Sequence, residues 1–230
     1  MQQLSLPIHQ LDDDSLTNFY ADNNLLLLDS LQKNFIQLKQ PVFYIWGPEG
    51  CGKSHLLKAV CNYFLSQQRS AVYVPLDKSQ YFSPAVLDNL ENQHAVCLDN
   101  LQIVMGDADW ERAIFDLFNR IKESGQCLLL ISANQSPKQL DIHLPDLASR
   151  LIWGEIYPLN PLNDAQKVQV LQQKSRQRGI ELPDDTANFL IKRLNRDTHS
   201  LFNTLEQLDK ASLQAQRKLT IPFVKEILAL

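Results

Sequence analysis

Short apolar runs alternate with stretches of helical periodicity through the larger, N-terminal part of the chain. Four runs are continuous and rich in β-branched or aromatic residues, as is typical of strands buried on both faces of a parallel sheet. They are Val42–Trp46, Ala71–Pro75, Ala95–Asp99 and Cys127–Ala133. Between them, apolar residues recur every three or four positions, which predicts amphipathic helices. The alternation therefore predicts an α/β fold with a parallel, doubly wound sheet.

The helices and the last strand of this fold have approximate limits. Helices are expected over residues 53–67 and 79–90, and a third opens at Asp109 and stops at Gly125. A helix-rich lead-in covers residues 15–38, and a final strand is expected over residues 151–157. Two prolines, Pro158 and Pro161, then mark a domain boundary.

The residues after Pro161 show only helical periodicity. One helix is expected from about Asp164 to Arg178, and three more carry apolar residues at helical spacing, among them Leu190, Leu205 and Phe223. We therefore divide the chain into three parts: a polar N-terminal tail (1–14), an α/β core (15–160), and a small helical domain (161–230) that would form a lid.

Composition is typical of a water-soluble globular protein. Of 230 residues, 44% are apolar and 21% are charged, and the net charge of −4 favours neither nucleic acid nor an anionic membrane. The first residues lack a basic start and contain Asp12-Asp13-Asp14, so no signal peptide is expected. The four cysteines form no Cys-x-x-Cys pair, which predicts neither a zinc site nor a disulfide framework. We expect a cytoplasmic protein without membrane contact.

A phosphate-binding loop follows the first strand. The residues Gly47-Pro48-Glu49-Gly50-Cys51-Gly52-Lys53-Ser54-His55 fit the Walker A pattern, between a buried strand and a helix. Backbone N–H groups of the loop and the helix N-terminus would surround a polyphosphate. Lys53 would reach its outer phosphates and the Ser54 hydroxyl would bind Mg²⁺. The alternative is a glycine-rich turn before an ordinary helix. The expected cofactors are ATP or ADP with Mg²⁺.

An aspartate ends the third strand. Asp99 follows four apolar residues, as in a Walker B strand whose carboxylate holds Mg²⁺ through water. Asp99 could also merely end a strand. In a parallel sheet, Gly47, Asp99 and Asn134 would all lie at the carboxyl edge, where ligands bind.

The residue after Asp99 bears on hydrolysis. Many ATPases of this architecture have a second acid here that activates water, but this chain has Asn100. An amide cannot act as a base at neutral pH. We therefore expect nucleotide binding with weak or no intrinsic ATPase activity.

These motifs together resemble those of the AAA+ proteins related to the bacterial replication initiator DnaA. The resemblance extends over essentially the whole chain. It rests on the phosphate loop, Leu98-Asp99-Asn100, Leu147-Ala148-Ser149-Arg150-Leu151-Ile152-Trp153-Gly154, the helical lid, and Gln3-Leu4-Ser5-Leu6-Pro7. The initiator itself has a second acid at the position of Asn100 and a C-terminal helix-turn-helix. This chain shows neither, and so is more similar to the short regulatory members.

The resemblance implies roles for particular residues. Arg150 would be an arginine finger acting on a neighbouring subunit's nucleotide, although an arginine at a helix end is ordinarily a surface residue. Asn134 would sense the γ-phosphate, although alone it is typical of a turn. Arg196 or His199 would take the place of a lid arginine that touches the phosphates. The pentapeptide Gln3–Pro7 (Gln3, Leu4, Ser5, Leu6, Pro7) would dock on the DNA polymerase sliding clamp, although such a tail is usually only a tail.

The function implied is negative regulation of replication initiation. The nucleotide-bound chain would dock on the DNA-loaded clamp, meeting DNA only indirectly, and stimulate ATP hydrolysis by the initiator DnaA through Arg150. One alternative is an autonomous AAA+ ATPase or clamp-loader-like motor, which Asn100 disfavours. Another is an adaptor of initiator filaments on DNA, which the acidic net charge disfavours. A small-molecule kinase shares the loop but lacks the arginine segment and lid. The oligomeric state stays open between monomer and homodimer.

Overall fold

The computed structural model describes residues 15–20, 24–194 and 198–229. The chain divides into two compact units. The first contains the residues up to Trp46 together with Lys53–Pro158, and the second contains Gly47–Gly52 together with Leu159–Leu230. We describe each unit by itself.

The first unit contains a five-stranded sheet in the order β2-β3-β4-β1-β5. Its strands are β1 (Val42–Trp46), β2 (Ala71–Pro75), β3 (Ala95–Asp99), β4 (Leu128–Ala133) and β5 (Glu155–Pro158). All neighbouring strands pair in parallel. Because Pro75 pairs with Asp99 and Trp46 with Ala133, β1 to β4 end at the same edge. The predicted parallel α/β sheet is confirmed.

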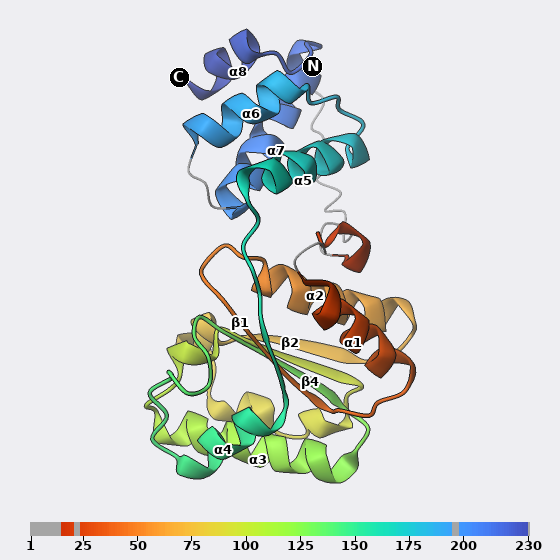
Figure 1. Ribbon diagram of the computed structural model, residues 1–230. Coiled ribbons are helices and arrows are strands. Elements are labelled where there is room, and N and C mark those ends of the chain that lie inside the picture. The colour runs from red at the N-terminus through yellow and green to blue at the C-terminus, as the bar shows by residue number, and fades with distance from the viewer. Residues whose placement is uncertain (1–14, 21–23, 195–197, 230) are drawn as a thin grey trace. The chain divides into compact units, whose positions relative to one another are not determined.

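Helices cover both faces of this sheet (Figure 1). α1 (Leu25–Ile36) and α2 (Lys53–Ser66) lie on one face, and α3 (Ala108–Ser124) and α4 (Pro145–Trp153) lie on the other. A short 3₁₀ turn, η1 (Leu16–Asn18), precedes α1. The α3 face is closed by fully buried side chains such as Ile114, Leu117 and Phe118. Strand residues therefore alternate between two buried layers, which explains their continuous apolar runs.

The predicted helix over residues 79–90 is wrong. The structure has three separate 3₁₀ turns there: η3 (Leu76–Tyr81), η4 (Pro84–Leu87) and η5 (Leu90–Asn92). Pro84 disfavours helical geometry at the preceding residue, and Ser83 is extended, with φ −91° and ψ 166°. Asn89 adopts the left-handed conformation, with φ 62°. Ser83 and Asn89 therefore interrupt a stretch whose apolar spacing is typical of a helix.

The expected strand over residues 151–157 also begins too early. Its first three residues form the last turn of α4, which continues to Trp153. Leu151 is buried one helical turn after Leu147, so the apolar residues at this point belong to a helix face. β5 begins only at Glu155.

The second unit contains four helices in its described residues. They are α5 (Asp164–Gln177), α6 (Asp184–Arg193), α7 (Thr198–Ala215) and α8 (Ile221–Leu228). α5 starts with a capping box between Asn163 and Gln166. Leu171, Leu190 and Leu205 belong to one buried apolar cluster. The predicted small helical domain is confirmed.

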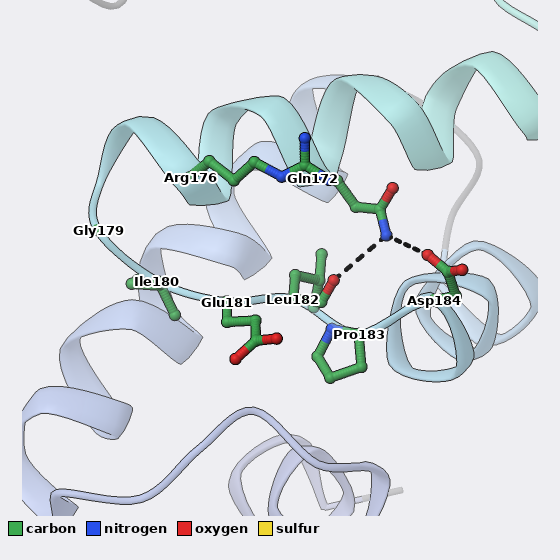
Figure 2. Close-up of a pocket in the computed structure, with 8 residues that line it drawn as sticks. All are labelled: Gln172, Arg176, Gly179, Ile180, Glu181, Leu182, Pro183 and Asp184. Atoms are coloured by element: carbon green, nitrogen blue, oxygen red, sulfur yellow. Dashed lines mark hydrogen bonds between the residues drawn. The ribbon is translucent and has the colours of Figure 1, made fainter.

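The connection between α5 and α6 borders a pocket (Figure 2). Eight residues line it: Gln172, Arg176, Gly179, Ile180, Glu181, Leu182, Pro183 and Asp184. The Gln172 amide donates to the Asp184 carboxylate at 2.5 Å and to the Leu182 carbonyl at 3.3 Å. These bonds hold the start of α6 against α5. Within the described residues, no helix is both long and apolar enough to cross a membrane.

Candidate functional site

The loop Gly47–Gly52 has the backbone shape that its glycines suggest. Gly50 and Gly52 have φ angles of 73° and 101°, a region that side-chain-bearing residues rarely adopt. The Cys51 N–H donates to the Pro48 carbonyl at 3.4 Å, which tightens the turn. A Cβ added to Gly47 would lie 2.5 Å from the Leu159 carbonyl oxygen. The loop therefore requires glycine for its conformation and its packing.

The three residues after this loop open α2. Lys53 is buried, with only 7% of its surface exposed, and Ser54 is half-buried. The His55 ring stacks on Phe19, with the ring centroids 5.9 Å apart and the planes 11° from parallel. The buried Phe19 thus brings the lead-in segment beside the start of α2.

Asp99 is the centre of a hydroxyl network at the end of β3. Its carboxylate is 1% exposed and accepts a hydrogen bond from the Tyr73 hydroxyl at 2.6 Å. The Ser132 hydroxyl donates to the other carboxylate oxygen. The Ser54 hydroxyl also interacts with the Tyr73 phenol and acts to lower its pKa. Ser54 and Asp99, which lie on different elements, therefore both act on Tyr73.

The Tyr73 phenol is a neutral donor in this network. Burial raises its pKa well above the usual range, and the bond to the negative Asp99 raises it further. The phenol keeps its proton at physiological pH and donates it to the carboxylate.

Ser54 and Asp99 fit the chemistry of a magnesium site. They supply one hydroxyl and one carboxylate, and Mg²⁺ prefers oxygen ligands while keeping several waters. Among the residues that the structure describes, no cluster of three or more His, Cys, Asp or Glu side chains could hold a metal. This donor set matches a hydrated ion shared with phosphates rather than an all-protein cage.

Asn100 and Asn134 are linked at the same edge of the sheet. Asn100 has the left-handed φ of 63°, and its N–H donates to the Ser132 hydroxyl at 2.9 Å. The Gln102 amide donates to the Asn100 side-chain oxygen at 3.4 Å, and its own oxygen accepts the Asn134 N–H at 3.1 Å. The Asn134 residue is exposed. A neutral amide therefore lies next to Asp99 in space as well as in sequence.

Sequence reasoning missed Tyr73, Ser132 and Gln102. The first two lie inside apolar strands and were assigned to the core with their neighbours. One signal could have found them: Tyr73 pairs with Cys97, two residues before Asp99, so that its side chain shares the face of Asp99. Ser132 follows Ile131, which pairs with Leu98, so Ser132 lies level with Asp99 on the neighbouring strand β4.

Arg150 lies in the last turn of α4. It is half-buried, and its guanidinium makes no ion pair or hydrogen bond with any residue that the structure describes. Leu147 and Leu151 anchor the helix in the core. The start of α4 is fixed by Glu111, which accepts the His143 and Leu144 N–H groups at 3.0 and 2.6 Å.

Three groups of predicted residues stay predictions. The pentapeptide Gln3–Pro7 lies outside the described residues, and so does Arg196. His199 lies in α7, but its side chain is outside the description.

Two family models match the chain. The bacterial DnaA ATPase domain matches residues 33–157, more than half of the chain, and the Hda lid domain matches residues 164–228. An uncharacterized protein of Haemophilus influenzae is 67% identical over 229 residues, which cover 100% of this chain and 99% of that protein.

Solved structures share the fold at low identity. Domain III of the Thermotoga maritima replication initiation protein DnaA has a TM-score of 0.79 and 18% identity, covering 95% of this chain and 96% of that one. AMPPCP-bound DnaA from Aquifex aeolicus has a TM-score of 0.72 and 20% identity, covering 87% and 66%. The Holliday junction branch migration motor RuvB of Thermotoga maritima has a TM-score of 0.70 and 15% identity, covering 95% and 72%.

The phosphate loop before α2 and Asp99 at the end of β3 both lie within residues 33–157, which the DnaA ATPase domain model matches. The chain belongs to the DnaA family of AAA+ replication proteins, and its helical domain is an Hda lid.

Proposed function

We propose that this chain is a nucleotide-bound regulator that accelerates ATP hydrolysis by the replication initiator DnaA. Two neighbouring residues carry the proposal. Asp99 accepts hydrogen bonds from two hydroxyl groups, and the next residue is Asn100, where a hydrolytic ATPase would need a catalytic acid. Such a site binds nucleotide but activates water poorly, because an amide does not accept the proton.

The chain's own nucleotide site would use residues around the start of α2. Loop N–H groups from Gly47 to Gly52 and the Lys53 ammonium would hold the phosphates of ADP or ATP. Ser54 and Asp99 would hold Mg²⁺, which would neutralise phosphate charge. The Aquifex DnaA of similar fold is described with AMPPCP bound, which supports a nucleoside polyphosphate as the ligand. Asn134 would approach the outermost phosphate.

Arg150 would act on the nucleotide of a DnaA molecule. Its guanidinium has no partner among the described residues, so no internal ion pair must break when a negatively charged phosphate approaches. An arginine supplied in trans stabilises the charge of phosphoryl transfer and is worth about 10³–10⁵ in rate.

The N-terminal pentapeptide would bring this activity to replicating DNA. Leu4 and Leu6 would enter apolar pockets of the sliding clamp, with Gln3 as a hydrogen-bonding group. Arg196 or His199 would supply the lid's contact to the phosphates. This arrangement makes the stimulation depend on a clamp that is loaded on DNA.

The test is phosphate release from ATP-loaded DnaA, measured with this protein and with DNA-loaded clamp or no clamp. Clamp-dependent acceleration is expected. Hydrolysis by this chain alone, without effect on DnaA, would favour an autonomous ATPase. Arg150→Ala should lose the stimulation by about 10³-fold or more while keeping ADP affinity. Arg112→Ala, an exposed arginine on α3, is the matched control and should stimulate normally.

Clamp docking has its own test. Leu6→Ala should weaken binding to the clamp in a surface-plasmon measurement by at least about tenfold, because one anchoring side chain is lost. Leu11→Ala, in the same N-terminal tail but outside the pentapeptide, is the control. An unchanged affinity for Leu6→Ala would exclude the pentapeptide as the docking element.

A further inference from the structure

Tyr73 interacts with both residues expected to hold magnesium. Its hydroxyl donates to Asp99 at 2.6 Å, and the Ser54 hydroxyl acts on the same phenol. We propose that Tyr73 determines how strongly nucleotide binding depends on Mg²⁺, because its hydroxyl already donates to the Asp99 oxygen on which a hydrated cation would depend. This inference assumes that the site binds a nucleotide, as proposed above.

The fold holds the Tyr73 ring in this position. Tyr73 is central in β2, an edge strand, and pairs with Cys97 of β3. The Lys58 ammonium of α2 lies 5.6 Å from the ring centroid, a cation–π distance. The ring is half-buried, so its hydroxyl reaches Asp99 from a side chain that strand pairing and α2 both confine.

The phenol and a hydrated cation compete for the same acceptor. Asp99 is buried, and the Ser132 hydroxyl already uses one of its oxygens. The other oxygen accepts the Tyr73 proton, and the water shell of Mg²⁺ also presents protons to carboxylates. The Tyr73 hydroxyl must therefore give up its bond to Asp99 when the cation enters, while the ring stays in place.

Nucleotide binding should accordingly gain little from magnesium in the natural chain. With Tyr73 in place, Asp99 keeps both of its hydroxyl donors without metal, so the empty site is stabilised. Tyr73→Phe keeps the ring and removes only the hydroxyl. The cation then replaces no hydrogen bond from Tyr73, and the gain from Mg²⁺ should rise by about tenfold, the scale of one hydrogen bond to a charged group.

The experiment measures the dissociation constant of ADP in EDTA and in saturating Mg²⁺ by calorimetry. The ratio of the two constants defines the magnesium factor. We expect a small factor for the natural chain and one about tenfold larger for Tyr73→Phe. Tyr81→Phe removes the hydroxyl of a tyrosine residue that is 77% exposed and should leave the factor unchanged. An equal or smaller factor for Tyr73→Phe overturns the inference.

A second measurement uses the natural chain and does not depend on a variant that folds. Displacement of Tyr73 from Asp99 should blue-shift near-ultraviolet tyrosine absorption when Mg²⁺ is added to the ADP complex, whereas no shift contradicts displacement. Failures of the two proposals are distinguishable. ADP binding with equal magnesium factors rejects only the role of Tyr73, while no binding of ADP or ATP under either condition rejects the nucleotide site and this inference with it.

Discussion

Two buried carboxylates in the α/β core accept hydrogen bonds from different kinds of donor. Asp99 and Glu111 are each 1% exposed. Asp99 accepts hydrogen bonds from two hydroxyl groups, those of Tyr73 and Ser132. In the part of the chain that the structure describes, Glu111 accepts only backbone N–H groups, from Gly106 at 2.8 Å, His143 at 3.0 Å and Leu144 at 2.6 Å.

The donors decide what each carboxylate does. A hydroxyl rotates and finds another acceptor at small cost, so Asp99 is able to exchange partners when a ligand enters. A backbone N–H is fixed by the chain, so Glu111 ties α3 to the loop at Gly106 and to the start of α4. Buried charge with exchangeable partners is suited to a binding site, and buried charge with fixed partners holds the fold.

The largest effect on stability is expected at Glu111, whose hydrogen-bond partners are fixed backbone groups. Glu111→Gln should lower the free energy of unfolding by about 2–3 kcal/mol, because the amide leaves buried N–H groups without an acceptor and places its own NH₂ against one of them. Urea unfolding followed by circular dichroism measures the change. Glu123→Gln, an exposed glutamate in the same helix, is the control and should change stability little.

A smaller effect on stability is expected at Asp99, whose hydroxyl partners can reorient. Asp99→Asn should cost about 1 kcal/mol or less of unfolding free energy, since the amide oxygen still accepts one bond and the hydroxyls of Tyr73 and Ser132 can reorient. The same urea titration measures it. A loss as large as that of Glu111→Gln would mean that the hydroxyls are as fixed as backbone groups, and the distinction between the two carboxylates would fail.

The smallest effect is a pH dependence. Burial acts to raise the pKa of Glu111, but the three backbone N–H groups outweigh it, so that this pKa lies below the usual 4.5. A lowered folded-state pKa gives stability that is present above the unfolded value and is lost as the pH falls through the folded value. The difference in unfolding free energy between the natural chain and Glu111→Gln should therefore be constant above about pH 5.5 and shrink below pH 4.5. A difference that grows towards acid pH would contradict this sign.

Local pattern was sufficient for the first three strands and for the phosphate loop. β1, β2 and β3 were predicted at their observed limits, because continuous apolar runs between turn residues leave few alternatives. The loop from Gly47 to Ser54 was found from glycine spacing, since its backbone conformation depends on residues within the motif itself. Asp99 at the edge of the sheet followed from the length of β3.

Tertiary structure alone decided the partners of these residues. From its position in the first turn of α3, Glu111 would be expected to interact with the helix dipole. Asp107, however, already caps α3 by accepting the Asp109 N–H at 3.0 Å and the Trp110 N–H at 3.2 Å. Glu111 is thereby left to bind backbone groups more than 30 residues away in sequence.

Tyr73 is a similar case, because an aromatic residue in an apolar strand reads as core. Outside residues 79–90, the sequence by itself determined the order of strands and helices, as well as the phosphate loop and the amide at residue 100. The tertiary structure decided that β2 pairs with β3 in the register that places the Tyr73 hydroxyl against Asp99. Strand pairing joins segments distant in the chain, and no local propensity encodes which polar groups then meet.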